Sequence, residues 1–256
     1  MSLTHAGMAS RIRAGIGGWT FEPWRDNFYP KGLPHSKELH YASRQLTAIE
    51  VNGTYYSTFK PSTFAKWRDE TPDGFVFALK ANRFATTRKV LATAGESVER
   101  FVNSGIAELG DKLGPVVWQF MPTKRFERDD FESFLQLLPA AAQGVKLRHV
   151  LDVRHESFLD PAFLPLARRY GCTAVHTDSD KFPAITDTGS ELAYLRLMRT
   201  AAGCPTGYAP TEIGKWVQGA RAWAGKGPTR EVFAFFISGA KERTPAAAAE
   251  FIRQLS

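Results

Sequence analysis

The feature that most constrains the fold is a repeated alternation between short apolar segments, rich in β-branched and aromatic residues, and longer segments with helical periodicity. This alternation predicts parallel βαβ units, because two parallel strands need a crossover connection. Eight segments are predicted to be strands: residues 12–17, 48–52, 75–80, 115–120, 149–154, 173–178, 192–198 and 231–237. Eight units in 256 residues favour a single-domain TIM-type (β/α)8 barrel, with a doubly wound open sheet as the alternative.

Helix start signals lie between the predicted strands. They are Ser36 before KELHYASRQL, Pro61 in PSTFAKWRDE, Asp129 and Asp130 before FESFLQLL, and Thr244-Pro245 before AAAAEFIRQL. Residues 96–109 predict one further helix, because their apolar side chains form a single stripe. The sixth unit is expected to be irregular, since KFPAITDTGSE contains too much Pro and Gly for a full helix.

Composition limits the class of protein. With 43% hydrophobic and 23% charged residues, and no apolar run long enough to span a bilayer, the chain is expected to be a cytoplasmic protein that does not enter a membrane. Residues 1–10 lack the pattern of an export signal and are interpreted as a disordered N-terminus or a cloning remnant, which leaves 11–256 as the barrel domain. Cys172 and Cys204 form neither a disulfide framework nor a CxxC motif. A monomer or weak oligomer is expected.

Polar residues follow the carboxyl ends of the predicted strands, where barrels bind their ligands. In AIEVN, Glu50 and Asn52 lie on the face opposite Ile49 and Val51. Further strands contribute Lys80, Gln119, Asp152, Arg154, His176, Asp178 and Arg196. This pattern predicts a polar cluster in the mouth of the barrel. A ligand site is favoured, although the acids and bases are also able to neutralise one another as an internal ion-pair network.

Loops at the same end add further candidates. The connection GGWTFEPWRDNFYPKG and the segment GTYYSTF supply an aromatic rim, in which Trp19 and Tyr55 are predicted to contact the ligand and most other rings to pack as a lid. His155 in DVRHESF is added to the predicted substrate-binding residues. Basic residues in KANRFATTRK, and the segment SGAKERTP that leads into a helix, suit an anion or phosphate. The net charge of +7 permits such a ligand without indicating it.

An ordered set of motifs resembles a known family. GGWTFEPWRDNFYPKG, IEVNGTYY, FALKA, LGPVVWQFMP, DVRHESF and YLRLM are similar to the YecE-like barrel proteins, the family of domain of unknown function 72. The resemblance runs from Ile12 to about Phe251 and implies a TIM-type barrel, but no particular reaction. The chain departs from the family pattern at Asp152, where Glu is usual, at Met198-Arg199, where His-Gly is usual, and at Ile237-Ser238, where Asn is usual. These departures indicate a different ligand or a loss of activity.

The leading functional hypothesis is an enzyme, of the hydrolase or transferase class, that acts on an anionic or phosphate-bearing substrate. Lys80, Arg154 and Arg196 would hold the negative charge, Glu50 or Asp152 would act as general base, and His176 would carry protons. A Schiff base on Lys80 ranks last, because nearby Glu50 and Asp152 should oppose the lowered pKa that it needs.

Two alternatives stay open. No cofactor is predicted, but a divalent-metal-dependent hydrolase or isomerase is an alternative, with Glu50, Asp152, His176 and Asp178 as ligands and three cations opposing the metal. The other is a non-catalytic protein that binds a nucleotide or RNA through the aromatic rim and the basic loops.

Overall fold

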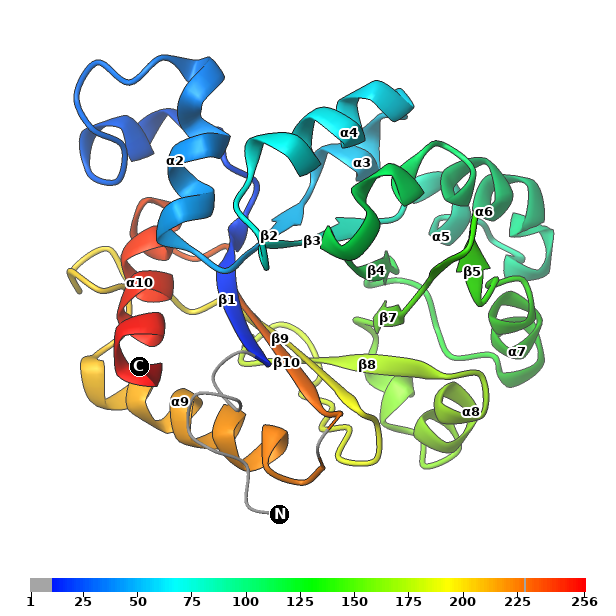
Figure 1. The fold of residues 1–256 in the computed structure, drawn as a ribbon. Helices are drawn as coiled ribbons and strands as arrows, with labels where there is room; N and C mark the ends of the chain where they lie inside the picture. The colour runs from blue at the N-terminus through cyan, green and yellow to red at the C-terminus, as the bar shows by residue number, and fades with distance from the viewer. Residues whose placement is uncertain (1–10, 228) are drawn as a thin grey trace.

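The computed structural model describes residues 11–227 and 229–256, and in this part of the chain eight parallel strands form a closed barrel (Figure 1). The strands are β1 (Ile12–Gly17), β2 (Ala48–Val51), β3 (Val76–Lys80), β4 (Leu113–Gln119), β7 (His149–Asp152), β8 (Cys172–Thr177), β9 (Leu192–Leu197) and β10 (Glu231–Phe236). β1 pairs with β2 on one side and with β10 on the other, which closes the cylinder. The predicted TIM-type barrel and its eight strands are confirmed, and the open sheet is wrong.

The remaining strands, β5 (Ala141–Ala142) and β6 (Val145–Lys146), form a short hairpin ahead of β7. Helices surround the barrel: α2 (Glu38–Gln45), α3 (Gly53–Tyr56), α4 (Pro61–Glu70), α5 (Arg83–Thr86), α6 (Gly95–Val102), α7 (Arg128–Gln136), α8 (Phe163–Arg169), α9 (Pro210–Ala224) and α10 (Thr244–Leu255). The 3₁₀ helices are η1 (Glu22–Asp26), η2 (His35–Lys37), η3 (Leu91–Ala94), η4 (Ile106–Lys112), η5 (Glu156–Leu159) and η6 (Lys241–Arg243). Proline stands in the first turn of α4, α9 and α10, as helix initiation favours.

The single helix expected over residues 96–109 is wrong. α6 ends at Val102, and the chain turns at Gly105, whose φ is +105°, before η4 begins. A Cβ at Gly105 would lie 2.7 Å from the Cα of Pro61, so the close approach of the α4 start explains the break. The sixth unit is irregular as predicted, since residues 178–191 contain no helix. None of the described helices is both long and apolar enough to cross a membrane.

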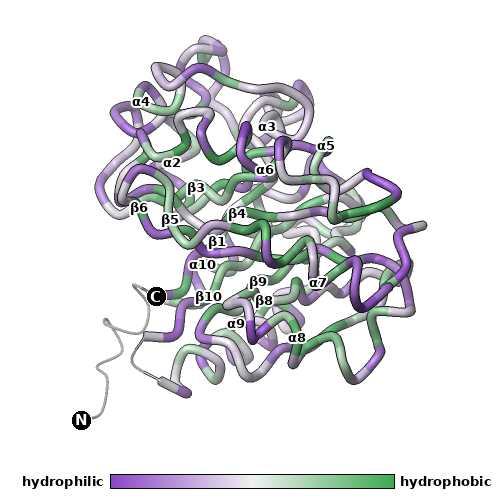
Figure 2. The backbone as a smooth tube through the Cα atoms, turned by 90° about the vertical axis from the view of Figure 1, so that its right-hand side faces the viewer, coloured by the Kyte–Doolittle hydropathy of each residue, from purple (hydrophilic) through white to green (hydrophobic). Residues whose placement is uncertain are grey.

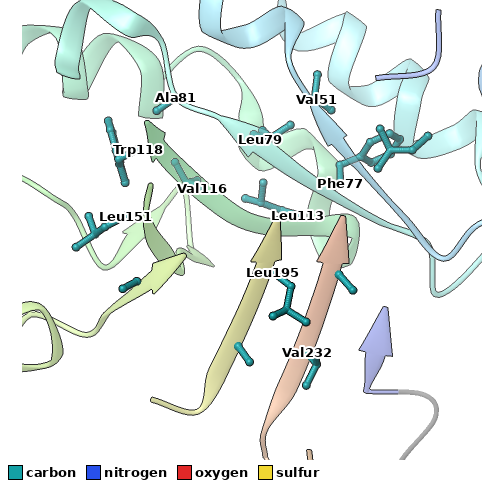
Figure 3. Close-up of a cluster of buried hydrophobic side chains, with 14 of the residues drawn as sticks. Val51, Phe77, Leu79, Ala81, Leu113, Val116, Trp118, Leu151, Leu195 and Val232 are labelled. Carbon is teal, nitrogen blue, oxygen red and sulfur yellow. The ribbon is translucent and has the colours of Figure 1, made fainter. Parts of the chain in front are cut away.

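Two apolar layers hold the barrel together. The outer layer packs strand side chains such as Phe77, Trp118 and Leu195 against the helices (Figure 3). The inner layer fills the barrel with Tyr194, Phe233, Phe235 and smaller branched residues. Hydrophobic residues accordingly follow the strands at the centre of the molecule, and hydrophilic residues follow the peripheral loops (Figure 2).

Ionised groups close the amino end of the barrel. Glu231 of β10 forms ion pairs with Arg148, which precedes β7, and with Arg13 of β1, whose Nε lies 4.0 Å from the carboxylate. The inner apolar layer separates this group from the polar residues at the carboxyl ends of the strands. Any ligand site in the barrel interior therefore opens at the carboxyl end.

Candidate functional site at the mouth of the barrel

A buried ion-pair network forms the floor of the mouth. Arg196 of β9 donates to Asp152 of β7 at 2.5 Å and to Glu50 of β2 at 3.1 Å. A weaker contact of 3.4 Å joins Arg196 to the side-chain oxygen of Gln119 on β4. The predicted convergence of Glu50, Gln119, Asp152 and Arg196 from four strands is therefore confirmed. The internal ion-pair network, expected as the alternative to a ligand site, is present as well.

Glu50 lies at the bottom of this network, with no exposed surface. Its second carboxylate oxygen accepts a hydrogen bond of 2.8 Å from the hydroxyl group of Tyr194. Burial and the Glu50 charge together raise the pKa of Tyr194 well above its usual value, so the phenol stays protonated and keeps donating. Because both oxygens are engaged and Glu50 does not line the open cavity, the geometry suits it to a structural role.

Asp152 is held in its ionised form. Burial raises the pKa of this carboxyl, but the guanidinium groups of Arg196 and Arg154 outweigh burial, so the pKa falls below its usual value. Arg154 follows β7 and donates to Asp152 at 2.9 Å, and its guanidinium lies 4.7 Å from the centre of the Phe182 ring. A carboxylate with a low pKa and two cationic partners is a weak proton acceptor.

Lys80, the last residue of β3, behaves differently from its cationic neighbours. Only 6% of its surface is exposed, and burial followed by the Arg196 charge lowers the pKa of its amine to about 8. Glu50 and Asp152 act in the opposite direction without cancelling the effect. The expected opposition from Glu50 and Asp152 is therefore present, but burial and the Arg196 charge outweigh it.

Above the network lies a cavity of about 620 Å³. Six cationic side chains line it, namely Lys80, Arg154, Lys181, Arg196, Arg199 and Lys241, together with one carboxylate, Asp180. Asp180 is itself 3.5 Å from Arg199. Asn52 and Gln119 contribute amides, and Gly17 of β1 leaves space beside Asn52, because a Cβ there would lie 2.8 Å from the amide nitrogen. The charge of the lining suits an anion.

The loop after β10 shapes one side of the cavity. Ser238 and Gly239 both adopt left-handed backbone conformations, with φ of +63° and +58°, and lead into η6 and α10. Left-handed backbone costs a serine of the order of 1 kcal/mol, and such strain gathers at functional sites. Ser238, Gly239, Lys241 and Thr244 all line the cavity. This region matches the place where (β/α)8 barrels commonly hold phosphate.

A model of the family described as "Protein of unknown function DUF72" matches residues 13–256. The chain belongs to the DUF72 family. The resemblance drawn from the motifs is thereby confirmed.

Three relatives of this DUF72 chain illustrate the range of similarity. The UPF0759 protein YunF of Bacillus subtilis (strain 168) is 25% identical over 157 residues, which are 59% of this chain and 54% of YunF, so the match spans about half of that relative. A DUF72 family protein from Thermotoga maritima MSB8 superposes with a TM-score of 0.76 at 22% identity, covering 95% of this chain and 98% of its own. A DUF72 family protein from Enterococcus faecalis V583 superposes with a TM-score of 0.69 at 17% sequence identity. The superposition covers 95% of this chain and 94% of the Enterococcus chain. The two structures share the fold.

Two strand residues of this DUF72 barrel that were predicted to face the interior lie outside the mouth. His176 points toward the helix layer, where its ring lies 5.9 Å from those of Trp216 and Trp223 and its Nδ1 contacts the carbonyl oxygen of Ile185 at 3.0 Å. Asp178 accepts hydrogen bonds from the backbone of Met198 and from the Tyr208 hydroxyl. The prediction that both face the interior is wrong, because Val175 occupies the inner face of β8 and period-two alternation turns His176 outward.

The separation of these residues also affects the metal alternative. Its four proposed ligands, Glu50, Asp152, His176 and Asp178, do not come together. Among the described residues no group of three His, Cys, Asp or Glu side chains is placed to hold a metal ion.

Of the two aromatic residues predicted to contact the ligand, one lies at the mouth of the barrel and the other packs in the outer apolar layer. Tyr55 of α3 reaches the mouth, where the Lys80 amine lies 4.6 Å from the centre of its ring. Trp19 packs outward against Trp67 and Phe77, so its predicted ligand contact is wrong. His155 caps η5 by accepting from the Ser157 backbone at 3.1 Å, and it does not line the cavity. Most other rings of residues 17–32 are packed, as the lid interpretation expects; Trp24, for example, is fully buried.

The sequence reasoning missed three residues that shape the site. Tyr194 shares the inner face of β9 with Arg196, so the same period-two argument applied two residues earlier would have found it. Lys181 and Phe182 lie in the irregular sixth unit, where no helical or strand periodicity places a side chain. Only the tertiary structure shows that these two residues line the cavity.

Proposed function

We propose that this DUF72 protein is an enzyme of the hydrolase or transferase class that binds a small phosphate-bearing substrate in the cavity at the carboxyl ends of the strands. The observation that supports this proposal most directly is the charge of the cavity lining, which contains six cationic side chains and one carboxylate. A cavity of this size accommodates a metabolite and excludes a folded protein. Clustered cations in a recessed pocket bind phosphate more strongly than the same charges on an open surface.

The two ends of the cavity suit two different tasks. The phosphate would lie near Ser238, Gly239 and Lys241, where backbone N–H groups and the Lys241 amine lie close to the start of η6 and α10. Lys80 and Arg154 approach from β3 and from the loop after β7, so the remainder of the substrate would lie between them. A group with a pKa of about 8 exchanges protons readily near neutral pH, which makes Lys80 the best supported acid–base group.

Replacing Arg154 with methionine tests the anion site. Loss of one of the six positive charges that line the cavity should weaken the binding of glycerol 3-phosphate by about tenfold. Isothermal titration calorimetry at low salt would measure the affinities of the wild type and of Arg154→Met. The fold should persist, because Asp152 retains its ion pair with Arg196.

The matched control is Arg253→Met, which removes an exposed arginine of α10 that pairs with Glu250 of the same helix. Its affinity for glycerol 3-phosphate should equal that of the wild type. An unchanged affinity in Arg154→Met, or equally tight binding of uncharged glycerol, would contradict the proposed site.

A second candidate function is the binding of a nucleotide or RNA. It is favoured by Tyr56 and Phe84, which are 63% and 58% exposed and flank the guanidinium of Arg83 at 5.9 and 5.6 Å from their ring centres. Exposed rings of this kind stack on bases. Single-stranded RNA that binds more weakly to Tyr56→Ala and Phe84→Ala, but equally well to Arg154→Met, would favour this candidate over the enzyme.

A further inference from the structure

The amine of Lys80 is directed at the cavity without an acceptor of its own. Among the residues that the structure describes, none accepts a hydrogen bond from Nζ. The Nζ atom lies over the Tyr55 ring, 4.6 Å from the ring centre. The other cations at the floor are engaged, since Arg196 bonds to Glu50 and Asp152, and Arg154 bonds to Asp152. Lys80 therefore presents a buried amine to whatever enters the cavity.

Charged and titratable groups face Lys80 from each surrounding element. They are Glu50 of β2, Tyr55 of α3, Asp152 and Arg154 at the end of β7, and Arg196 of β9. The carboxylates are held by the two arginines and by Tyr194. Lys80 is thus left largely buried beside two cations and an aromatic face, a combination that activates an amine as a nucleophile.

We propose that Lys80 forms a Schiff base with an aldehyde or ketone carbonyl of the substrate. The inference rests on the proposed function and narrows its substrate class to phosphate-bearing carbonyl compounds. The anion would be held by the cations at the β10 side of the cavity, while the carbonyl carbon meets the amine at the end of β3.

Imine formation at Lys80 is a condensation that releases water and needs no oxidant or reductant. The nitrogen lone pair of the neutral amine attacks the carbonyl carbon, a C–N bond forms, and the carbonyl π electrons move to oxygen. The oxygen takes one proton from the former amine and one from solvent, and it leaves as water while the C=N bond forms. The product is a protonated imine, which draws electrons from the adjacent carbon and eases cleavage or transfer of a bond there.

The state of the amine at neutral pH agrees with this role. With its pKa lowered to about 8 from the usual 10.5, roughly one Lys80 in ten is neutral at about pH 7, against roughly one in 3,000 for an ordinary lysine. A less basic amine is also a weaker nucleophile, so the rate of imine formation should rise by less than the ratio of the two neutral fractions. Imine formation at Lys80 should still exceed that at an exposed lysine by at least about tenfold.

Reductive trapping of the full chain tests the inference. The protein would be incubated with dihydroxyacetone phosphate and sodium cyanoborohydride, and the adducts mapped by peptide mass spectrometry. The expected result is a predominant adduct on Lys80 that forms at least about tenfold faster than on exposed Lys66. The adduct should disappear in Lys80→Met, persist in Lys66→Met and form more slowly with added inorganic phosphate. Labelling that spreads evenly over exposed lysines, or that maps to Lys241, would overturn the inference.

Failure of this inference is separable from failure of the proposed function. If glycerol 3-phosphate binding depends on Arg154 but Lys80 is not labelled, the Schiff base is wrong and the anion site stands. If unphosphorylated dihydroxyacetone labels Lys80 as fast as its phosphate ester does, the amine chemistry is supported and the phosphate-binding function is contradicted.

Discussion

Arg196→Met is expected to lower the free energy of unfolding by about 3 to 5 kcal/mol, because it leaves the carboxylates of Glu50 and Asp152 buried without their shared cation. The guanidinium of β9 bonds to side chains of β7 and β2, neither of which pairs with β9, so its loss also removes a link across the mouth. Urea denaturation at about pH 7 would measure the change. The exposed pair Arg100–Glu96 on α6 provides the matched control, and Arg100→Met should change stability by less than about 0.5 kcal/mol.

The pH dependence of this loss has a definite sign. The pKa of Asp152 is lowered in the folded protein, so its ionised form contributes stability above the unfolded pKa, near 3.8, and that contribution disappears as the pH falls through the lower folded pKa. The difference between wild type and Arg196→Met should therefore shrink in acid. Combining Arg196→Met with Glu50→Gln and Asp152→Asn should recover much of the lost stability, since all three charges are then removed. A single variant as stable as the wild type would show that the network does not stabilise the barrel.

Lys80→Met is expected to raise the free energy of unfolding by about 1 to 3 kcal/mol at about pH 7, while abolishing imine formation. The wild-type amine is mostly protonated at that pH, although burial and Arg196 disfavour its charge. Because its folded pKa of about 8 lies below the unfolded value of 10.5, the unfolded chain binds more protons in this window, and wild-type stability rises with pH across it. The gain from methionine should therefore be largest below about pH 8 and diminish above it.

Urea denaturation of wild type and Lys80→Met at about pH 7 and about pH 9.5 would test this prediction. Lys66→Met, at an exposed position of α4, should stay within about 0.5 kcal/mol of the wild type at both pH values. A loss of stability in Lys80→Met at about pH 7 would identify Lys80 as the counter-ion that Glu50 and Asp152 require. A gain would identify it as a group kept in place at a cost to stability, as functional residues often are.

The positions of His176 and Asp178 show that the alternation of side chains along a strand does not predict which face of the strand is the inner one. Alternation alone states that the residues on either side of Val175 point away from it, but it does not say which of the two faces is the interior. For β2 the polar face proved to be the inner one, because Glu50 has Arg196 and Tyr194 as partners there. For β8 the inner face carries Val175, and the polar His176 finds its partners between α9 and the irregular sixth unit. The tertiary partners available on each side of the strand decided the face in both cases.

The amino-acid sequence by itself determined the eight barrel strands, the helix starts at Pro61 and Thr244, the irregular sixth unit and the concentration of Glu50, Lys80, Gln119, Asp152 and Arg196 at one end. These features follow from local periodicity and from parallel strand direction. Only the tertiary structure decided how the charges are shared. Coulomb energies depend on distance and burial, and both are set by strands remote in sequence. The pairing of Arg196 with two carboxylates, and the lowered pKa that burial and the Arg196 charge give Lys80, are therefore properties of the closed barrel.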